Sequence, residues 1–227
     1  MKFIYKDTEH EIPTSLSQIK LRQKIEFDNL YGEKIEALKN EVFGDENKEV
    51  DDIDTMLLTF SVAAMNFSFF SGIPLEEVEQ NIAVDDVLNI YYSCFYQLFQ
   101  QEEELELQPE YLWNDEFWKL ESPELTFESK ITFNEFITSK QIIKQMSELG
   151  SGHWDSLPYL ACIYLKREDE KFDEKWISPG SERMEMMLDL PMDIAVAVAF
   201  FLQSSMSMYL KTLASSQEEE AEKEQHA

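Results

Sequence analysis

The sequence offers few groups that could do chemistry, and none has the spacing of a known catalytic or metal-binding motif. The stretch Gly150-Ser151-Gly152-His153 places a hydroxyl beside an imidazole, but neighbours in sequence seldom point at each other and no GxSxG motif is present. The three histidines, His10, His153 and His226, have no metal-ligand spacing among them. We therefore expect a helix-terminating loop around Ser151, and no catalytic or metal-ligating residue.

Calcium and nucleotide sites are also not expected. The segment from Asp45 to Asp51 resembles the start of an EF-hand, but Val50 stands in the glycine position and Met56 in the position of the bidentate glutamate. The phosphate-binding patterns GxxxxGK[ST] and GxGxxG do not occur. Carboxylates are so numerous that no pair can be singled out for acid–base catalysis. The sequence thus predicts no cofactor, and an enzyme ranks last among the function classes.

The charge balance restricts the partners. The chain has 227 residues, with 19 basic against 46 acidic side chains and a net charge of -27, and 44% of it is hydrophobic, which is enough for a folded core. A phosphate backbone would be repelled, so nucleic acid is not an expected partner. A basic protein surface fits the charge, although acidity also serves ordinary solubility.

Cys94 and Cys162 lie in apolar sequence without a CxxC pair, so we expect buried free thiols. The amino terminus lacks the apolar stretch of a signal peptide, which predicts synthesis inside the cell.

The elements that would position any site follow a plan that occurs twice. Residues 3–25 and 111–137 each contain an aromatic strand, a polar turn, a second short strand and a helix start. The turns are Lys6-Asp7 and Asn114-Asp115, and the helix starts are Ile19-Lys20-Leu21-Arg22-Gln23 and Ile131-Thr132-Phe133-Asn134-Glu135. If the repetition is a duplication, function lies in an assembly of two related modules more than in one pocket.

This plan predicts a mainly α protein with two related helical modules, each opened by a short β-hairpin. The expected modules are residues 1–104 and 105–214, followed by an acidic tail at 215–227. The first module should hold a helix over 21–43, with Gly32 as a candidate break, and an acidic loop over 45–54.

Local signals place further elements in the two modules. Apolar residues at steps of three and four predict another helix over 84–99 in the first module. In the second module, Thr132 and Glu135 match a capping box and predict a helix over 133–149. A short apolar helix should follow over 157–165, and then a charged stretch over 166–174.

Two segments without formal charge, 55–75 and 194–210, raise the alternative of a membrane span. Polar residues dilute both, and acidic residues without basic anchors flank the first. We expect core or subunit-interface helices and no stable membrane insertion.

Several apolar side chains are candidate contacts with a partner protein. Aromatic residues crowd the second hairpin and the first uncharged segment, and methionines, which adapt to irregular surfaces, occur near the carboxyl end. Packing inside the module is the alternative for all of them. The candidates are Tyr111, Trp113, Phe117, Trp118, Phe69, Phe70, Met206 and Met208.

The residues IPTSLSQIKLRQ and ITFNEFI, each behind a small hairpin, resemble small acidic proteins encoded among the structural genes of tailed phages that infect Bacteroidales, including the crAss-like phages. The resemblance is one of overall pattern across both modules, and no functional residue transfers with it. It implies a role in the virion or in assembly, as a component of the portal, tail or neck, a packaged cargo protein, or a tail-assembly chaperone.

Three non-enzymatic hypotheses follow. The first is a virion-associated protein that binds phage structural proteins, or itself, through repeated contacts. The second is an assembly chaperone that acts in the host cytoplasm and is absent from the mature particle. The third is an acidic DNA mimic, which ranks lower because the carboxylates are spread over loops, tail and helix faces.

Overall fold

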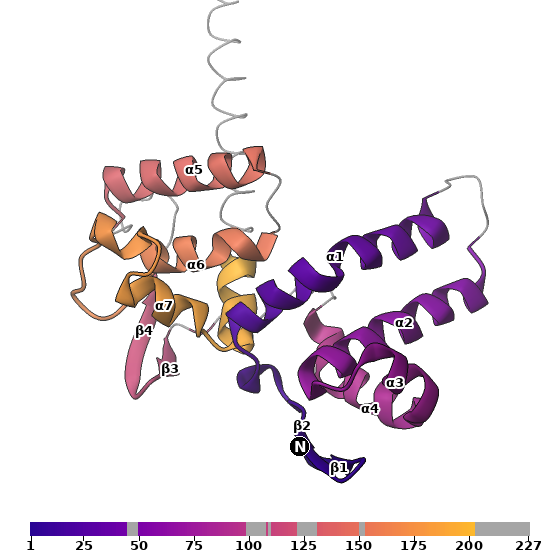
Figure 1. The fold of residues 1–227 in the computed structure, drawn as a ribbon. Helices are drawn as coiled ribbons and strands as arrows, with labels where there is room; N and C mark the ends of the chain where they lie inside the picture. Colours follow the sequence, from indigo (N-terminus) through magenta and orange to yellow (C-terminus); the bar gives the residue numbers. More distant parts are fainter. Residues whose placement is uncertain (45–49, 99–107, 109, 122–130, 150–152, 203–227) are drawn as a thin grey trace, which may run out of the picture. The chain divides into compact units, whose positions relative to one another are not determined.

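The computed structural model describes residues 1–44, 50–98, 108, 110–121, 131–149 and 153–202. The chain is mainly helical with two small antiparallel sheets, as the sequence predicts (Figure 1). The EF-hand-like residues 45–49, the loop at Ser151, Met206, Met208 and the acidic tail lie outside the described residues.

The chain divides into two compact units. Unit 1 comprises Met1–Glu102 and Pro191–Asp193, and unit 2 comprises Glu103–Leu190 and Ile194–Ala227. All four tryptophans, Trp113, Trp118, Trp154 and Trp176, belong to unit 2. Tryptophan fluorescence therefore reports on unit 2 alone.

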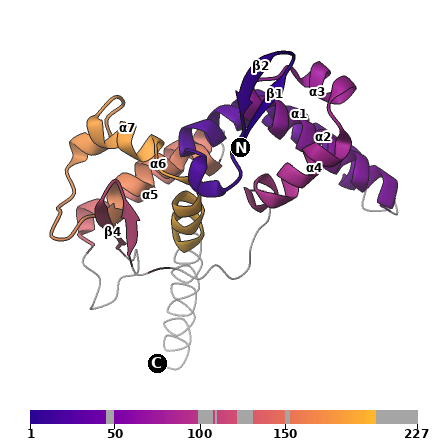
Figure 2. The same cartoon turned by 90° about the horizontal axis from the view of Figure 1, so that it is seen from below.

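Unit 1 opens with a two-stranded hairpin and continues with helices. Its elements are β1 (Lys2–Tyr5), β2 (Thr8–Glu11), the 3-10 helix η1 (Leu16–Gln18), α1 (Leu21–Phe43), α2 (Asp52–Ser71), α3 (Leu75–Asn81), α4 (Val84–Ser93) and the 3-10 helix η2 (Phe95–Leu98). The hairpin packs beside α2, where the rings of Phe3 and Phe67 are 5.8 Å apart (Figure 2).

Unit 2 also opens with a two-stranded hairpin followed by helices, and it has one additional strand. Its elements are β3 (Tyr111–Trp113), β4 (Glu116–Leu120), α5 (Phe133–Glu148), α6 (His153–Tyr164), β5 (Leu165–Lys166), the 3-10 helix η3 (Glu174–Ile177) and α7 (Glu182–Leu188). A last helix, Met192–Leu202, begins within the short segment that belongs to unit 1. The sheet order is β3-β4-β5, with both pairs antiparallel.

Both hairpins turn through two residues in the left-handed region. Lys6 and Asp7 have φ of 48° and 62°, and Asn114 and Asp115 have φ of 53° and 61°. Two consecutive left-handed residues define the type I′ turn, whose twist matches that of the flanking strands. The two polar turns predicted from the sequence are therefore present and have the same geometry.

The helix starts also repeat at the level of hydrogen bonds. In α5, the Thr132 amide donates to Glu135 Oε2 at 2.6 Å, and the Glu135 amide donates to Thr132 Oγ1 at 3.3 Å, which confirms the predicted capping box. At the start of α1, the Lys20 amide donates to Gln23 Oε1 at 2.9 Å in the equivalent position. In both α1 and α5, the side chain of the third helical residue therefore accepts the amide of the residue that precedes the helix.

Three predictions of detail are wrong. Helix α1 runs through Gly32 without a break. Helix α2 begins at Asp52, inside the predicted acidic loop, because the Asp51 carboxylate accepts the Ile53 amide at 2.9 Å and carboxylates stabilise a helix amino terminus. The helix predicted over 84–99 ends at Ser93 as α4, and residues Phe95–Leu98 form a separate 3-10 helix.

The uncharged segment at 55–75 supplies the centre of unit 1. Helix α2 buries residues from Val62 to Ser68 and is capped by Gly72 at its carboxyl end. Gly72 has a φ of 72°, and its backbone N–H donates a hydrogen bond to the Ser68 carbonyl. The candidates Phe69 and Phe70 are half-buried. The Phe70 ring stacks on Phe95 at 4.7 Å, and Phe69 meets Phe27 edge-on at 5.6 Å.

The unbroken helix at Gly32 gives a stability prediction. A Cβ added at Gly32 would meet nothing within 4 Å, so Gly32→Ala should stabilise unit 1 by about 0.5–1 kcal/mol through reduced chain entropy. Gly72→Ala is the matched control and should destabilise by about 1 kcal/mol, because its positive φ strains an L residue. Urea unfolding followed by circular dichroism at 222 nm measures both, and destabilisation by Gly32→Ala would show that α1 is interrupted there.

Candidate protein-contact site

The register of the second hairpin separates its aromatic side chains onto two faces. Tyr111 pairs with Trp118, and Leu112 pairs with Phe117. Side chains alternate along a strand, so Tyr111, Trp113 and Trp118 share the inner face, while Leu112 and Phe117 share the outer face.

The inner face is the interior of unit 2. Trp118 is fully buried and Trp113 nearly so, and the Trp118 indole N–H donates to the Trp113 carbonyl at 3.1 Å. These two residues, predicted as candidate partner contacts, therefore serve as core, because alternation turns them toward the helices. Tyr111 is half-buried on the same face.

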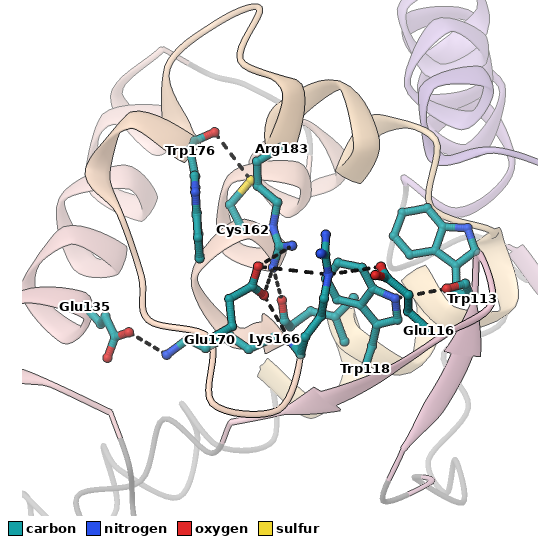
Figure 3. A network of polar contacts seen from close by, with 11 residues as sticks. Trp113, Glu116, Trp118, Glu135, Cys162, Lys166, Glu170, Trp176 and Arg183 are labelled. Atoms are coloured by element: carbon teal, nitrogen blue, oxygen red, sulfur yellow. Dashed lines mark hydrogen bonds and ion pairs between the residues drawn. The ribbon is translucent and has the colours of Figure 1, made fainter.

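Arg183 of α7 holds this inner face in place. Its guanidinium carbon lies 4.5 Å from the Trp118 ring centre and 4.7 Å from the Trp176 ring centre, so the planar cation lies between two indoles (Figure 3). Arg167 adds a second cation at 4.8 Å from the Trp118 ring. Cation–π contacts of this kind contribute more when they are shielded from water.

Arg183 uses both terminal nitrogens for hydrogen bonds within unit 2, whereas its buried Nε has no hydrogen-bond partner among the described residues. Arg183 Nη2 donates to the Leu165 carbonyl at 2.7 Å and to Glu170 Oε2 at 3.1 Å. Burial lowers the pKa of Arg183, and the Glu170 carboxylate opposes that shift. One side chain therefore joins β4, β5, η3 and α7.

A buried ion pair connects α5 to β5. Lys166 Nζ donates to Glu135 Oε1 at 2.5 Å, and both side chains are almost inaccessible (Figure 3). Burial opposes ionisation of Glu135, but the bonds from Lys166 and from the Thr132 amide together hold its pKa below the usual value. The capping glutamate of α5 thus also neutralises the buried lysine.

Two other polar side chains of this region, Tyr164 and Cys162, are also buried. The Tyr164 hydroxyl donates to Ser139 Oγ at 2.6 Å. Cys162 is a buried free thiol near the Trp176 carbonyl, and burial raises its pKa to about 12, so it is not a nucleophile at neutral pH. Burial likewise raises the pKa of Cys94 to about 11, and both cysteines are buried and free as predicted.

The outer face of the hairpin is the exposed apolar part of this site. Leu112 is 64% exposed and Phe117 is 61% exposed. The two-residue turn makes Leu112 and Phe117 a non-hydrogen-bonded pair, the kind in which opposing side chains approach most closely. We refer to Leu112 and Phe117 together as the hairpin platform.

The margin of the hairpin platform is acidic. Lys119 lies on the same face, and its amine pairs with Glu110 at 3.0 Å and Glu168 at 3.8 Å. Asp115 at the turn adds another exposed carboxylate. A group that covers the platform would therefore meet an apolar centre with a negative border.

The first hairpin provides an internal comparison. Its register pairs Ile4 with Glu9 in the position that Leu112 and Phe117 occupy in the second hairpin. Ile4 is exposed, but Glu9 and its ion pair with Lys2 at 3.1 Å make that face polar. The two hairpins share their turn and differ in the outer face, and only alternation about the predicted turn could have shown this from the sequence.

Among the described residues, no group of three or more His, Cys, Asp and Glu side chains is placed to hold a metal ion. Comparison with known proteins finds no matching family model, no matching curated protein and no matching solved structure.

The arginine–tryptophan stack predicts a large loss of stability for Arg183→Met, about 3 kcal/mol, because Glu170 and the Leu165 carbonyl lose their donor. Arg183→Lys should cost less, since it keeps the charge and loses only the planar stacking. Urea unfolding followed by tryptophan fluorescence measures both. Lys144→Met, at an exposed lysine, is the control and should stay within about 0.5 kcal/mol. A similarly small effect of Arg183→Met would show that the stack is not the main stabilising contact in unit 2.

The buried ion pair predicts a pH dependence. The pKa of Glu135 is lowered in the folded state, so its contribution is present above the unfolded pKa and is lost as pH falls through the folded pKa. Unfolding of unit 2 between pH 7 and 3, followed by fluorescence, should show this loss, and Glu135→Gln should flatten the profile.

Glu148→Gln, at an exposed carboxylate that pairs with Lys144, should leave the profile unchanged. Equal profiles for wild type and Glu135→Gln would contradict the account of the pair.

Proposed function

We propose that this protein is a non-enzymatic, acidic, virion-associated protein of a tailed phage, working through protein–protein contacts at the portal, tail or neck as a structural component or packaged cargo. The contact role rests on the exposed hairpin platform of Leu112 and Phe117. The inner face of the same hairpin is buried, and Arg183 packs on its Trp118 ring. The phage assignment rests on the resemblance of the hairpin-to-helix pattern to phage structural-gene products.

The contact role follows from the cost of leaving the platform in water. Two large apolar side chains stand together on a rigid turn, and covering them would stabilise a complex by about 1–3 kcal/mol each. Contiguous exposed apolar surface bordered by polar residues marks interaction sites, and these two side chains adjoin across the hairpin. The net charge of -27 disfavours a second copy as the partner at low salt and favours a basic protein surface.

An assembly chaperone would suit an adaptable methionine surface near the carboxyl end. Among the described residues, Met184, Met187 and Met192 are buried and Met186 is half-buried. A chaperone would be absent from purified particles, and the experiment described next distinguishes it from a virion protein on that basis.

The platform predicts a selective loss of partner binding. Phe117→Glu reproduces the Glu9 of the first hairpin and should reduce retention in purified particles at least tenfold, as measured by quantitative mass spectrometry, because it places a charge in the apolar contact. Fold stability should change by less than about 0.5 kcal/mol, since the side chain is exposed.

Ile4→Ser on the polar outer face of the first hairpin is the matched control and should leave retention unchanged. Wild-type protein that is abundant in infected cells but absent from particles would replace the virion role with the chaperone role. Unchanged retention of Phe117→Glu would exclude the platform as the contact.

A further inference from the structure

Unit 1 carries a second exposed apolar surface, on the first turns of α2. Ile53, Met56 and Leu57 are 58%, 45% and 54% exposed, and Phe60 is half-buried. Their spacing places all four along one side of the helix. We refer to these four residues as the α2 stripe.

The α2 stripe continues directly into the core of unit 1. The next positions along the same side, Ala63, Ala64 and Phe67, are buried. Helices α3 and α4 pack against α2 (Figure 1). The hairpin strand β2 also contacts α2, and the rings of Phe3 and Phe67 lie 5.8 Å apart. One helix side is therefore covered over its carboxyl half, while among the described residues its amino half is left open.

The exposed half gives α2 an unusual character for a core helix. By length and composition it is apolar enough to cross a membrane, and only 39% of its most apolar 18-residue window is buried. A helix that only served as core would be buried along this whole side.

The charges around the α2 stripe select the partner. Six carboxylates and only two lysines lie near the stripe, counted over residues 31–44 and 50–60. One of these lysines, Lys39, is already paired with Glu36 at 2.7 Å. Asp51 and Asp52 stand at the end of the stripe itself. An anionic membrane surface would be repelled by this border, and so would a second copy of the same acidic surface.

We propose that the α2 stripe is a docking surface for an amphipathic helix of a partner protein, with an apolar face that covers Ile53, Met56, Leu57 and Phe60 and with lysine or arginine at its margins. A helix fits because apolar side chains at positions 53, 56, 57 and 60 form the i, i+3, i+4, i+7 pattern that packs against the apolar face of another helix. The stripe spans about 10 Å, so two to three turns of a partner helix suffice.

The proposal is independent of the hairpin platform, which belongs to unit 2. Phe117→Glu should leave binding at the α2 stripe unchanged, so failure of one proposal does not decide the other.

The test uses the full chain and two labelled 18-residue peptides of leucine and lysine. One peptide places the leucines on a single helical face, and the other has the same composition with the leucines distributed around the helix. Fluorescence anisotropy should show at least about tenfold tighter binding of the amphipathic peptide, since both peptides have equal charge and only one offers an apolar face.

The variant Ile53→Ser/Leu57→Ser should bind the amphipathic peptide at least tenfold more weakly than wild type does. Val84→Ser, at an exposed apolar residue of α4, is the control and should bind it as wild type does. Circular dichroism at 222 nm checks that the double variant is folded, and Met56→Lys serves in its place if it is not.

Four outcomes would overturn the proposal. Equal affinity for the two peptides would leave only charge attraction, and unchanged binding by the double variant would place the peptide elsewhere. Light scattering that shows a wild-type dimer, dissociated by the double variant, would assign the α2 stripe to a second copy. Flotation with phosphatidylcholine vesicles, lost in the double variant, would assign it to a membrane.

Discussion

The insertion of Arg183 between Trp118 and Trp176 is the contact on which the rest of unit 2 depends. Burying a guanidinium is costly unless its charge is paired, and here the Glu170 carboxylate pairs with it while the Leu165 carbonyl accepts from Nη2. A two-stranded hairpin is marginally stable alone. Here the buried Trp118 holds the hairpin against the interior of unit 2. The hairpin therefore stays folded although its outer face is apolar and exposed.

The two faces of this hairpin therefore have different roles. Alternation commits Trp113 and Trp118 to the core and leaves Leu112 and Phe117 in water. Glu135 and Lys166 of the same unit are paired with each other and buried, so the interior of unit 2 works as a support for the exposed surface. The same principle holds in unit 1, where the buried half of α2 supports an exposed half.

Local signals in the sequence were sufficient for the turns and the helix starts. Asn114-Asp115 and the Thr132 and Glu135 pair were predictable because each needs only neighbouring residues. The burial of Trp118 and Lys166 was not, since their partners Arg183 and Glu135 lie far away in the sequence. The break predicted at Gly32 failed because tertiary packing of α1 against α2 outweighs the low helix propensity of one glycine.

The central claim is that the inner face of the second hairpin is structural and that its outer face binds a partner. A photo-crosslinking amino acid placed separately at positions 117 and 118, in chains assembled in infected cells, tests this most directly. We predict crosslinks from position 117 to a different protein and crosslinks from position 118 only within the same chain. Intermolecular crosslinks from position 118, or none from position 117, would contradict the account.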